Sequence, residues 1–153
     1  MKFISFLHNK EAKFGILNNK AITNLTGKIS DANTLKDLIK NKRIAEAKNY
    51  ASENPGNISL DEIEYLPLIP NPGKIICVGL NYSEHVKETN RTVEENPVIF
   101  HRFPESQTAH MQPIQRPIAS HSLDYEGEMA VIMGEPGKHI KPQDALNHIV
   151  GYS

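Results

Sequence analysis

Residues 122–134, with the sequence SLDYEGEMAVIMG, set three acidic side chains at alternate positions directly before the apolar run MAVIM. The acidic residues are Asp124, Glu126 and Glu128. Alternate residues of a β-strand point to the same face, so this spacing in a strand would direct the three carboxylates into one small volume. Their mutual repulsion predicts either a solvated surface or a positive charge among them.

This acidic stretch has two interpretations. Carboxylate oxygens are the preferred ligands of Mg²⁺ and Mn²⁺, which makes Glu126 and Glu128 candidate metal ligands. An acidic strand face is more often simply solvated, and a Glu-x-Glu pattern alone is weak support for a metal site. The pattern by itself favours the solvated strand, and both interpretations stay open at this point.

The composition is that of a globular protein without a basic surface. The 153 residues carry a formal net charge of -1, so we expect no nucleic-acid partner. The apolar runs are too short to cross a bilayer, so we expect no membrane partner. The sequence opens without a leader pattern, and its single cysteine, Cys77, fits a reducing compartment, which favours a cytoplasmic location. The apolar residues around it, 74–79, are expected to form a buried strand, with Cys77 in the core.

Residues 1–70 are expected to form a small N-terminal α/β domain. Short strand-like segments between residues 2 and 26 are separated by turn residues. Apolar residues at helical spacing predict two short helices within residues 35–51, with Thr34 among the candidate caps. The proline-rich residues 66–73 have the composition of a linker, which places the domain boundary there.

Residues 71–153 are expected to form part of a second domain, again with both strands and helices. The predicted strands cover residues 74–79, 97–100 and 125–133, and the predicted helices cover residues 81–89 and 142–149. The sequence stops directly after apolar strand-like residues, so we expect the chain to be part of a longer protein.

The predicted helix at residues 81–89 carries the second candidate site. Asn81 is its expected cap, with Glu84 completing a capping box. His85 and Glu88 are three residues apart and share a helix face, so the carboxylate can orient the imidazole as a general base. An ordinary pair on a surface helix is the alternative. The sequence lacks GxGxxG, GxxxxGK[ST], GxSxG and HExxH patterns, which removes the usual support for nucleotide-binding, serine hydrolase and zinc protease functions.

Taken together, four segments closely resemble the fumarylacetoacetate hydrolase family. They are KIICVGLNYSEH at residues 74–85, PVIF at 97–100, LDYEGE at 123–128 and GY at 151–152. The resemblance covers about residues 72–153, and the segment before it resembles the family's variable N-terminal domain. It implies an α+β fold of mixed β-sheets, truncated here because the C-terminal half is absent, and a homodimer.

The resemblance also implies roles for individual residues. Glu126 and Glu128 match two of the family's ligands for Mg²⁺ or Mn²⁺, and the third ligand, an aspartate, is expected a few residues after Tyr152. His85 and Glu88 match the family's catalytic His–Glu dyad.

Two further residues are expected to contact the substrate, Tyr82 and Arg102. Arg102 stands near the position where many members have a lysine. An arginine there can hold a substrate carboxylate through two hydrogen bonds, where a lysine acts as a point charge.

The function implied by the resemblance is a metal-dependent hydrolase or lyase in aromatic catabolism. It would act on C–C bonds of 2-oxo acids, such as acylpyruvates or fumarylacetoacetate-like compounds, through a metal-stabilised enolate. The alternatives are an isomerase or hydratase of 2-oxo-dienedioates, a non-catalytic module that binds a small acid, and a structural oligomerisation domain. Because the third metal ligand would be missing, these 153 residues alone are expected to be inactive.

Overall fold

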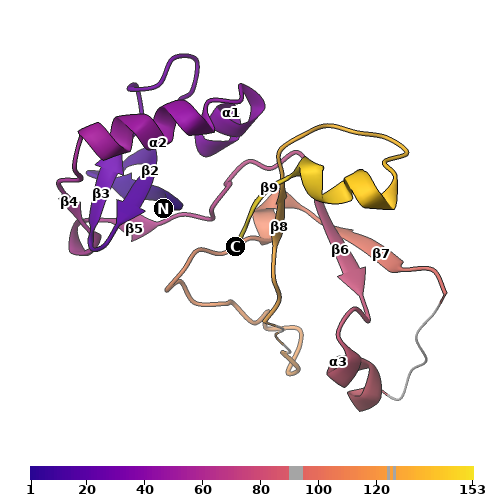
Figure 1. Ribbon diagram of the computed structural model, residues 1–153. Coiled ribbons are helices and arrows are strands. Elements are labelled where there is room, and N and C mark those ends of the chain that lie inside the picture. Colours follow the sequence, from indigo (N-terminus) through magenta and orange to yellow (C-terminus); the bar gives the residue numbers. More distant parts are fainter. Residues whose placement is uncertain (90–94, 124, 126) are drawn as a thin grey trace. The chain divides into compact units, whose positions relative to one another are not determined.

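The computed structural model describes residues 1–89, 95–123, 125 and 127–153 (Figure 1). These residues form two compact units: a larger unit of residues 1–69 and 108–153, and a smaller unit of residues 70–107. Both contain antiparallel strand pairs and short helical segments, which confirms the predicted α+β class. The assignment of residues 1–70 and 71–153 to separate domains stays a prediction.

The larger unit contains a five-stranded antiparallel sheet with the strand order β4-β3-β2-β1-β5. Its strands are β1 (Lys2–His8), β2 (Glu11–Asn18), β3 (Ala21–Asn24), β4 (Ile58–Ser59) and β5 (Glu64–Tyr65). The turn from β1 to β2 places Asn9 and Lys10 at positive φ, and Asn19 has a positive φ in the next turn. Asparagine tolerates this conformation well, so the predicted strands and turns in residues 2–26 are confirmed.

Two helices follow the first three strands, α1 (Leu35–Lys40) and α2 (Ile44–Glu53). Thr34 caps α1 through a capping box: its hydroxyl accepts from the backbone N–H of Asp37, and the Asp37 carboxylate accepts from Thr34 in return. The two predicted helices and the Thr34 cap are therefore confirmed. A single 3₁₀ turn, η1 (Leu60–Glu62), connects β4 to β5.

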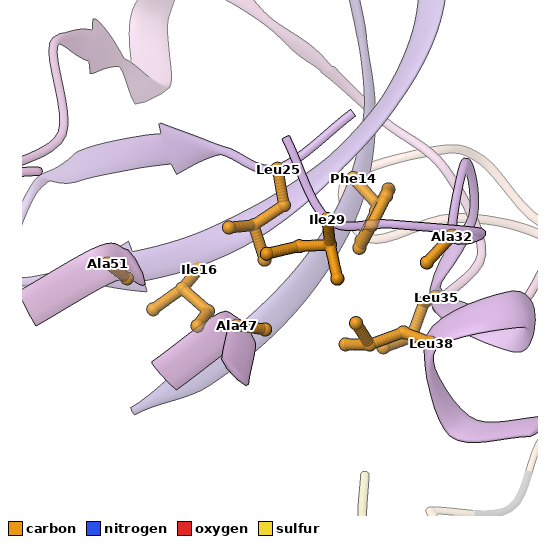
Figure 2. Close-up of a cluster of buried hydrophobic side chains, with 9 residues drawn as sticks. All are labelled: Phe14, Ile16, Leu25, Ile29, Ala32, Leu35, Leu38, Ala47 and Ala51. Atoms are coloured by element: carbon orange, nitrogen blue, oxygen red, sulfur yellow. The ribbon is translucent and has the colours of Figure 1, made fainter. Parts of the chain in front are cut away.

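The core of the larger unit lies between the sheet and these helices. Figure 2 shows side chains from β2, from the loop between β3 and α1, and from α1 and α2 turned toward one another. They are Phe14, Ile16, Leu25, Ile29, Ala32, Leu35, Leu38, Ala47 and Ala51. Strand alternation puts a second buried cluster on the opposite sheet face, namely Ile4, Phe6, Ile22 and Ile58.

The smaller unit is built on one antiparallel pair, β6 (Ile75–Gly79) and β7 (Val98–Arg102). Between them lies α3 (Ser83–Glu88), and η2 (Pro104–Ser106) follows β7. The strand prediction is confirmed, but the prediction that residues 74–79 are buried is wrong: Ile76 is 61% exposed and Cys77 is only partly buried. A sheet of two strands has few neighbouring side chains with which to cover both faces.

The acidic segment leads into a second two-stranded pair, β8 (Val131–Met133) with β9 (Ile149–Tyr152). Ala130 and Ser153 extend the pairing through two backbone hydrogen bonds of 2.8 and 2.9 Å. The prediction of a strand beginning at residue 125 is wrong for the described residues before Ala130, because strand geometry needs a paired neighbour. The predicted helix at residues 142–149 is the 3₁₀ helix η3 (Pro142–His148).

None of the helices in the described residues is both long and apolar enough to span a bilayer.

Leu38 tests the packing of the larger unit, because its side chain is completely buried. We expect Leu38→Ala to lower the free energy of unfolding by about 2–5 kcal/mol, since it removes buried methyl groups and leaves a cavity. Lys40→Ala, at an exposed position of the same helix, should change it by less than about 0.5 kcal/mol. Urea denaturation followed by circular dichroism measures both, and equal effects would contradict this core assignment.

Candidate active site

The helix α3 begins differently from the sequence prediction. Its N-cap is Tyr82, in an extended conformation with φ -111° and ψ 127°, so the prediction that Asn81 caps the helix is wrong. The carboxylate of Glu84, predicted to complete a capping box, instead accepts a 2.7 Å hydrogen bond from Nζ of Lys87. Residues three apart on a helix are neighbours, so Lys87 and Glu84 form an ordinary ion pair on the exposed surface of α3.

His85 and Glu88 lie together on α3, as their spacing predicts. Nδ1 of His85 is 3.9 Å from Oε2 of Glu88, which is an ion-pair distance rather than a hydrogen bond. The His85 side chain is 35% exposed and that of Glu88 is 76% exposed, so an added substrate or solvent can reach both. The arrangement can orient an imidazole for proton transfer, and the catalytic roles of both residues stay predictions.

Two contacts hold this part of α3 in place. Val86 is the buried residue of the helix, at 8% exposure, and anchors it by apolar packing. At the other end, the backbone N–H and the hydroxyl of Thr89 both donate to the carbonyl oxygen of His85, at 3.1 and 3.0 Å. Thr89 is thus the C-cap of α3 and binds the backbone carbonyl of His85. The sequence analysis missed this role, although a threonine in the last turn can form such a bond.

The two predicted substrate contacts lie in the same unit as His85. Tyr82 is 42% exposed at the start of α3. Arg102 is exposed at the end of β7, where it pairs with Ile75 of β6. The rings of its neighbours His101 and Phe103 pack edge to face, with their centroids 5.6 Å apart. A tyrosine hydroxyl and a guanidinium are suitable donors to a carboxylate, and contact of either residue with a substrate stays a prediction.

Of the two predicted metal ligands, Glu128 is described and Glu126 lies outside the described residues, as does Asp124. Glu128 is exposed in the irregular segment before β8. A Cβ added at Gly127 would meet no described atom within 4 Å, so the backbone beside Glu128 is open to a close neighbour.

A divalent cation fits the chemistry of Glu128, but the described residues do not complete a site for one. Among them, no three His, Cys, Asp or Glu side chains lie close enough together to hold a metal ion. Mg²⁺ needs near-octahedral oxygen coordination, which one carboxylate supplies only in small part. His85 and Glu88 belong to the smaller unit and Glu128 to the larger unit, so their assembly into one site stays a prediction.

Each unit contains one notable hollow. A cavity of about 310 Å³ in the larger unit is lined by β1, residues 65–68 and residues 108–110, and its described lining includes none of the predicted site residues. A hollow of about 240 Å³ in the smaller unit lies where β6 leads into α3, next to Leu80 and Asn81. The candidate site residues that the structure describes, namely Tyr82, His85, Glu88, Arg102 and Glu128, do not line either hollow.

Residues 74–153 match the family model described as fumarylacetoacetate (FAA) hydrolase C-terminal. The chain belongs to the fumarylacetoacetate hydrolase family. All four segments that carry the resemblance in the sequence lie within these residues, so the predicted family is confirmed.

Individual relatives agree with this membership. The mitochondrial oxaloacetate tautomerase of Xenopus laevis is 41% identical over 107 residues, covering 70% of this chain and 34% of that protein. The fumarylacetoacetate hydrolase structure from Exiguobacterium antarcticum is 28% identical with a TM-score of 0.68, covering 100% of this chain and 54% of that one. The chain thus spans about a third of its curated relative and about half of this solved structure.

A third comparison supports the fold alone. Maleylpyruvate hydrolase from a Sphingobium species, solved with manganese (II) and pyruvate, is 19% identical with a TM-score of 0.77. The match covers 99% of this chain and 56% of that one. With these structures the predicted fold of the fumarylacetoacetate hydrolase family is confirmed.

The accessible His85–Glu88 pair is expected to contribute little to the free energy of unfolding. Exposed ion pairs typically contribute about 0–1 kcal/mol, so we expect Glu88→Gln to change the free energy of unfolding by less than about 0.5 kcal/mol. Urea denaturation of the wild type and the variant measures this change. A loss of several kcal/mol would mean that the pair is a structural element, which would contradict its assignment as a candidate catalytic dyad.

Proposed function

We propose that an intact protein containing this chain catalyses the enolisation of a 2-oxo acid with the help of a divalent metal ion. The observation that carries the proposal is the accessible His85–Glu88 pair on α3, in a chain of the fumarylacetoacetate hydrolase family. Formation of an enolate is shared by keto–enol isomerisation, decarboxylation and hydrolytic C–C cleavage of 2-oxo acids. Enolate formation is therefore the proposed common step, whichever of these reactions follows it.

His85 is the proposed base. When the gap of 3.9 Å closes to hydrogen-bond distance, Nδ1–H donates to the Glu88 carboxylate and Nε2 is left as the proton acceptor. Nε2 then takes a proton from the carbon beside the 2-oxo group. The electron pair of that C–H bond forms a C=C bond, and the π pair of the 2-oxo group moves onto its oxygen to give an enolate. Dyads of this kind are often longer without substrate than with it, so the distance is compatible with the role.

The metal ion is proposed to be Mg²⁺ or Mn²⁺. Glu126 and Glu128 would hold it with at least one further ligand that these residues do not provide, because two carboxylates alone bind Mg²⁺ loosely. When bound, such an ion acts as a Lewis acid that stabilises negative charge on the 2-oxo oxygen. Tyr82 and Arg102 are proposed to hold the substrate through its carboxylates, where the guanidinium can form two parallel hydrogen bonds.

Two reactions have specific support. The Xenopus laevis relative is named an oxaloacetate tautomerase, which favours return of the proton to the enolate oxygen and hence keto–enol exchange. The Exiguobacterium antarcticum structure is named a fumarylacetoacetate hydrolase, which favours C–C cleavage. In that reaction His85 would take its proton from water, and the hydroxide would add to the second carbonyl carbon. The bond from that carbon to the CH2 carbon between the two carbonyl groups would then break, with its electron pair forming the enolate and the attacked carbon leaving as a carboxylic acid.

The assembly and location of the protein are further parts of the proposal. A homodimer and a cytoplasmic location are both predicted from the sequence, and the Xenopus laevis relative is named as a mitochondrial protein. Sedimentation of the intact protein and its location in cell fractions test these two predictions separately.

Replacing His85 tests the proposed base. In the intact protein, we expect His85→Ala to lower kcat for oxaloacetate tautomerisation, or for acylpyruvate hydrolysis, by about 10²- to 10⁴-fold. Its affinity for Mn²⁺ should stay within about twofold of the wild type, because His85 is not a proposed ligand. His121→Ala, at an exposed histidine without a proposed role, should retain wild-type turnover. Unchanged turnover in His85→Ala would refute the catalytic role and leave the non-catalytic binding module as the better hypothesis.

Calorimetry with Mn²⁺ tests the proposed metal ligands in the intact protein. We expect Glu126→Ala and Glu128→Ala each to weaken Mn²⁺ binding by about tenfold or more, because each removes one anionic ligand. Glu105→Ala, at another exposed glutamate, is the matched control and should bind as the wild type does. Equal Mn²⁺ affinity in all four proteins would support the solvated acidic segment instead.

A further inference from the structure

Leu80 has an unusual backbone for an aliphatic residue. Its φ is +57°, in the left-handed region that glycine and asparagine tolerate and other residues seldom adopt. It lies directly between the last residue of β6, Gly79, and the approach to α3 (Figure 1). Such a conformation persists only where the surrounding structure fixes the chain on both sides.

Both sides of Leu80 are indeed fixed. Before it, Gly79 pairs with Val98, and a Cβ at Gly79 would lie only 3.3 Å from Cγ1 of Val98, so the two strands approach closely at this point. After it, the N–H of Val86 donates to the carbonyl of Tyr82 at 3.1 Å, and the Val86 side chain is buried. The left-handed turn is what connects these two fixed points.

We propose that Leu80 is a positioning residue for the His85 imidazole, a role that rests on the proposed function. Its left-handed backbone sets the direction in which the chain leaves β6. It thereby sets the orientation of α3 and of the helix face that carries His85 and Glu88. Leu80 has no proposed contact with the reacting atoms and acts only through the helix.

Two substitutions separate backbone conformation from side-chain contact. Asparagine tolerates positive φ, whereas a β-branched valine strongly disfavours it. In the intact enzyme we expect kcat of Leu80→Val to be about tenfold below that of Leu80→Asn, with KM values within about threefold of each other. Equal kcat values for the two variants would overturn the proposal.

A double variant distinguishes positioning from general destabilisation. If Leu80 acts through His85, then Leu80→Val combined with His85→Ala should be no slower than His85→Ala alone. A purely structural effect of Leu80→Val would lower the residual turnover further, by about the same tenfold factor, and would overturn the proposal.

Hydrogen exchange tests the positioning of α3 without any assay of turnover. The amides of Val86 and Thr89 should exchange about tenfold faster in Leu80→Val than in Leu80→Asn, because the helix loses its fixed starting direction. Equal exchange overturns the role of Leu80 even if His85 is catalytic. If His85→Ala retains full turnover, the proposed function fails, and the exchange comparison still decides whether Leu80 positions the helix.

Discussion

Backbone pairing between β8 and β9 is the constraint on which the candidate metal site depends. The hydrogen bonds between Ala130 and Ser153 continue that pairing, so Glu128 lies two residues from an anchored backbone. Glu126 precedes Glu128 by only two residues in the sequence. Like charges at such a spacing repel, whereas a divalent cation between them converts repulsion into attraction.

Much of the larger unit could be predicted from the sequence because its signals are local. Alternating apolar residues and asparagine-rich turns define β1 to β3, and helical spacing with the Thr34 cap defines α1. The same local geometry brought His85 and Glu88 together, since residues three apart on a helix are neighbours wherever the helix lies. The family was identified from short segments whose order and spacing are specific.

The remaining features depend on neighbours that a local pattern does not reveal. The apolar composition of residues 74–79 predicted burial, yet burial requires a covering layer, and Ile76 is largely exposed. The Asn81 cap was predicted from residue types, but the helix begins one residue later, with Tyr82 as its N-cap and the Glu84 carboxylate paired with Lys87. A left-handed leucine at residue 80 has no signal in the sequence, because aliphatic residues rarely adopt that conformation.

The central claim, which stays a proposal, is that a divalent cation joins Glu126 and Glu128. Anomalous diffraction from crystals of the intact protein grown with Mn²⁺ tests it most directly, because manganese scatters anomalously and the protein's light atoms do so only weakly. We predict an anomalous peak in direct contact with carboxylate oxygens of both glutamates. Both side chains extending apart into solvent, with no peak between them at saturating Mn²⁺, would contradict the claim.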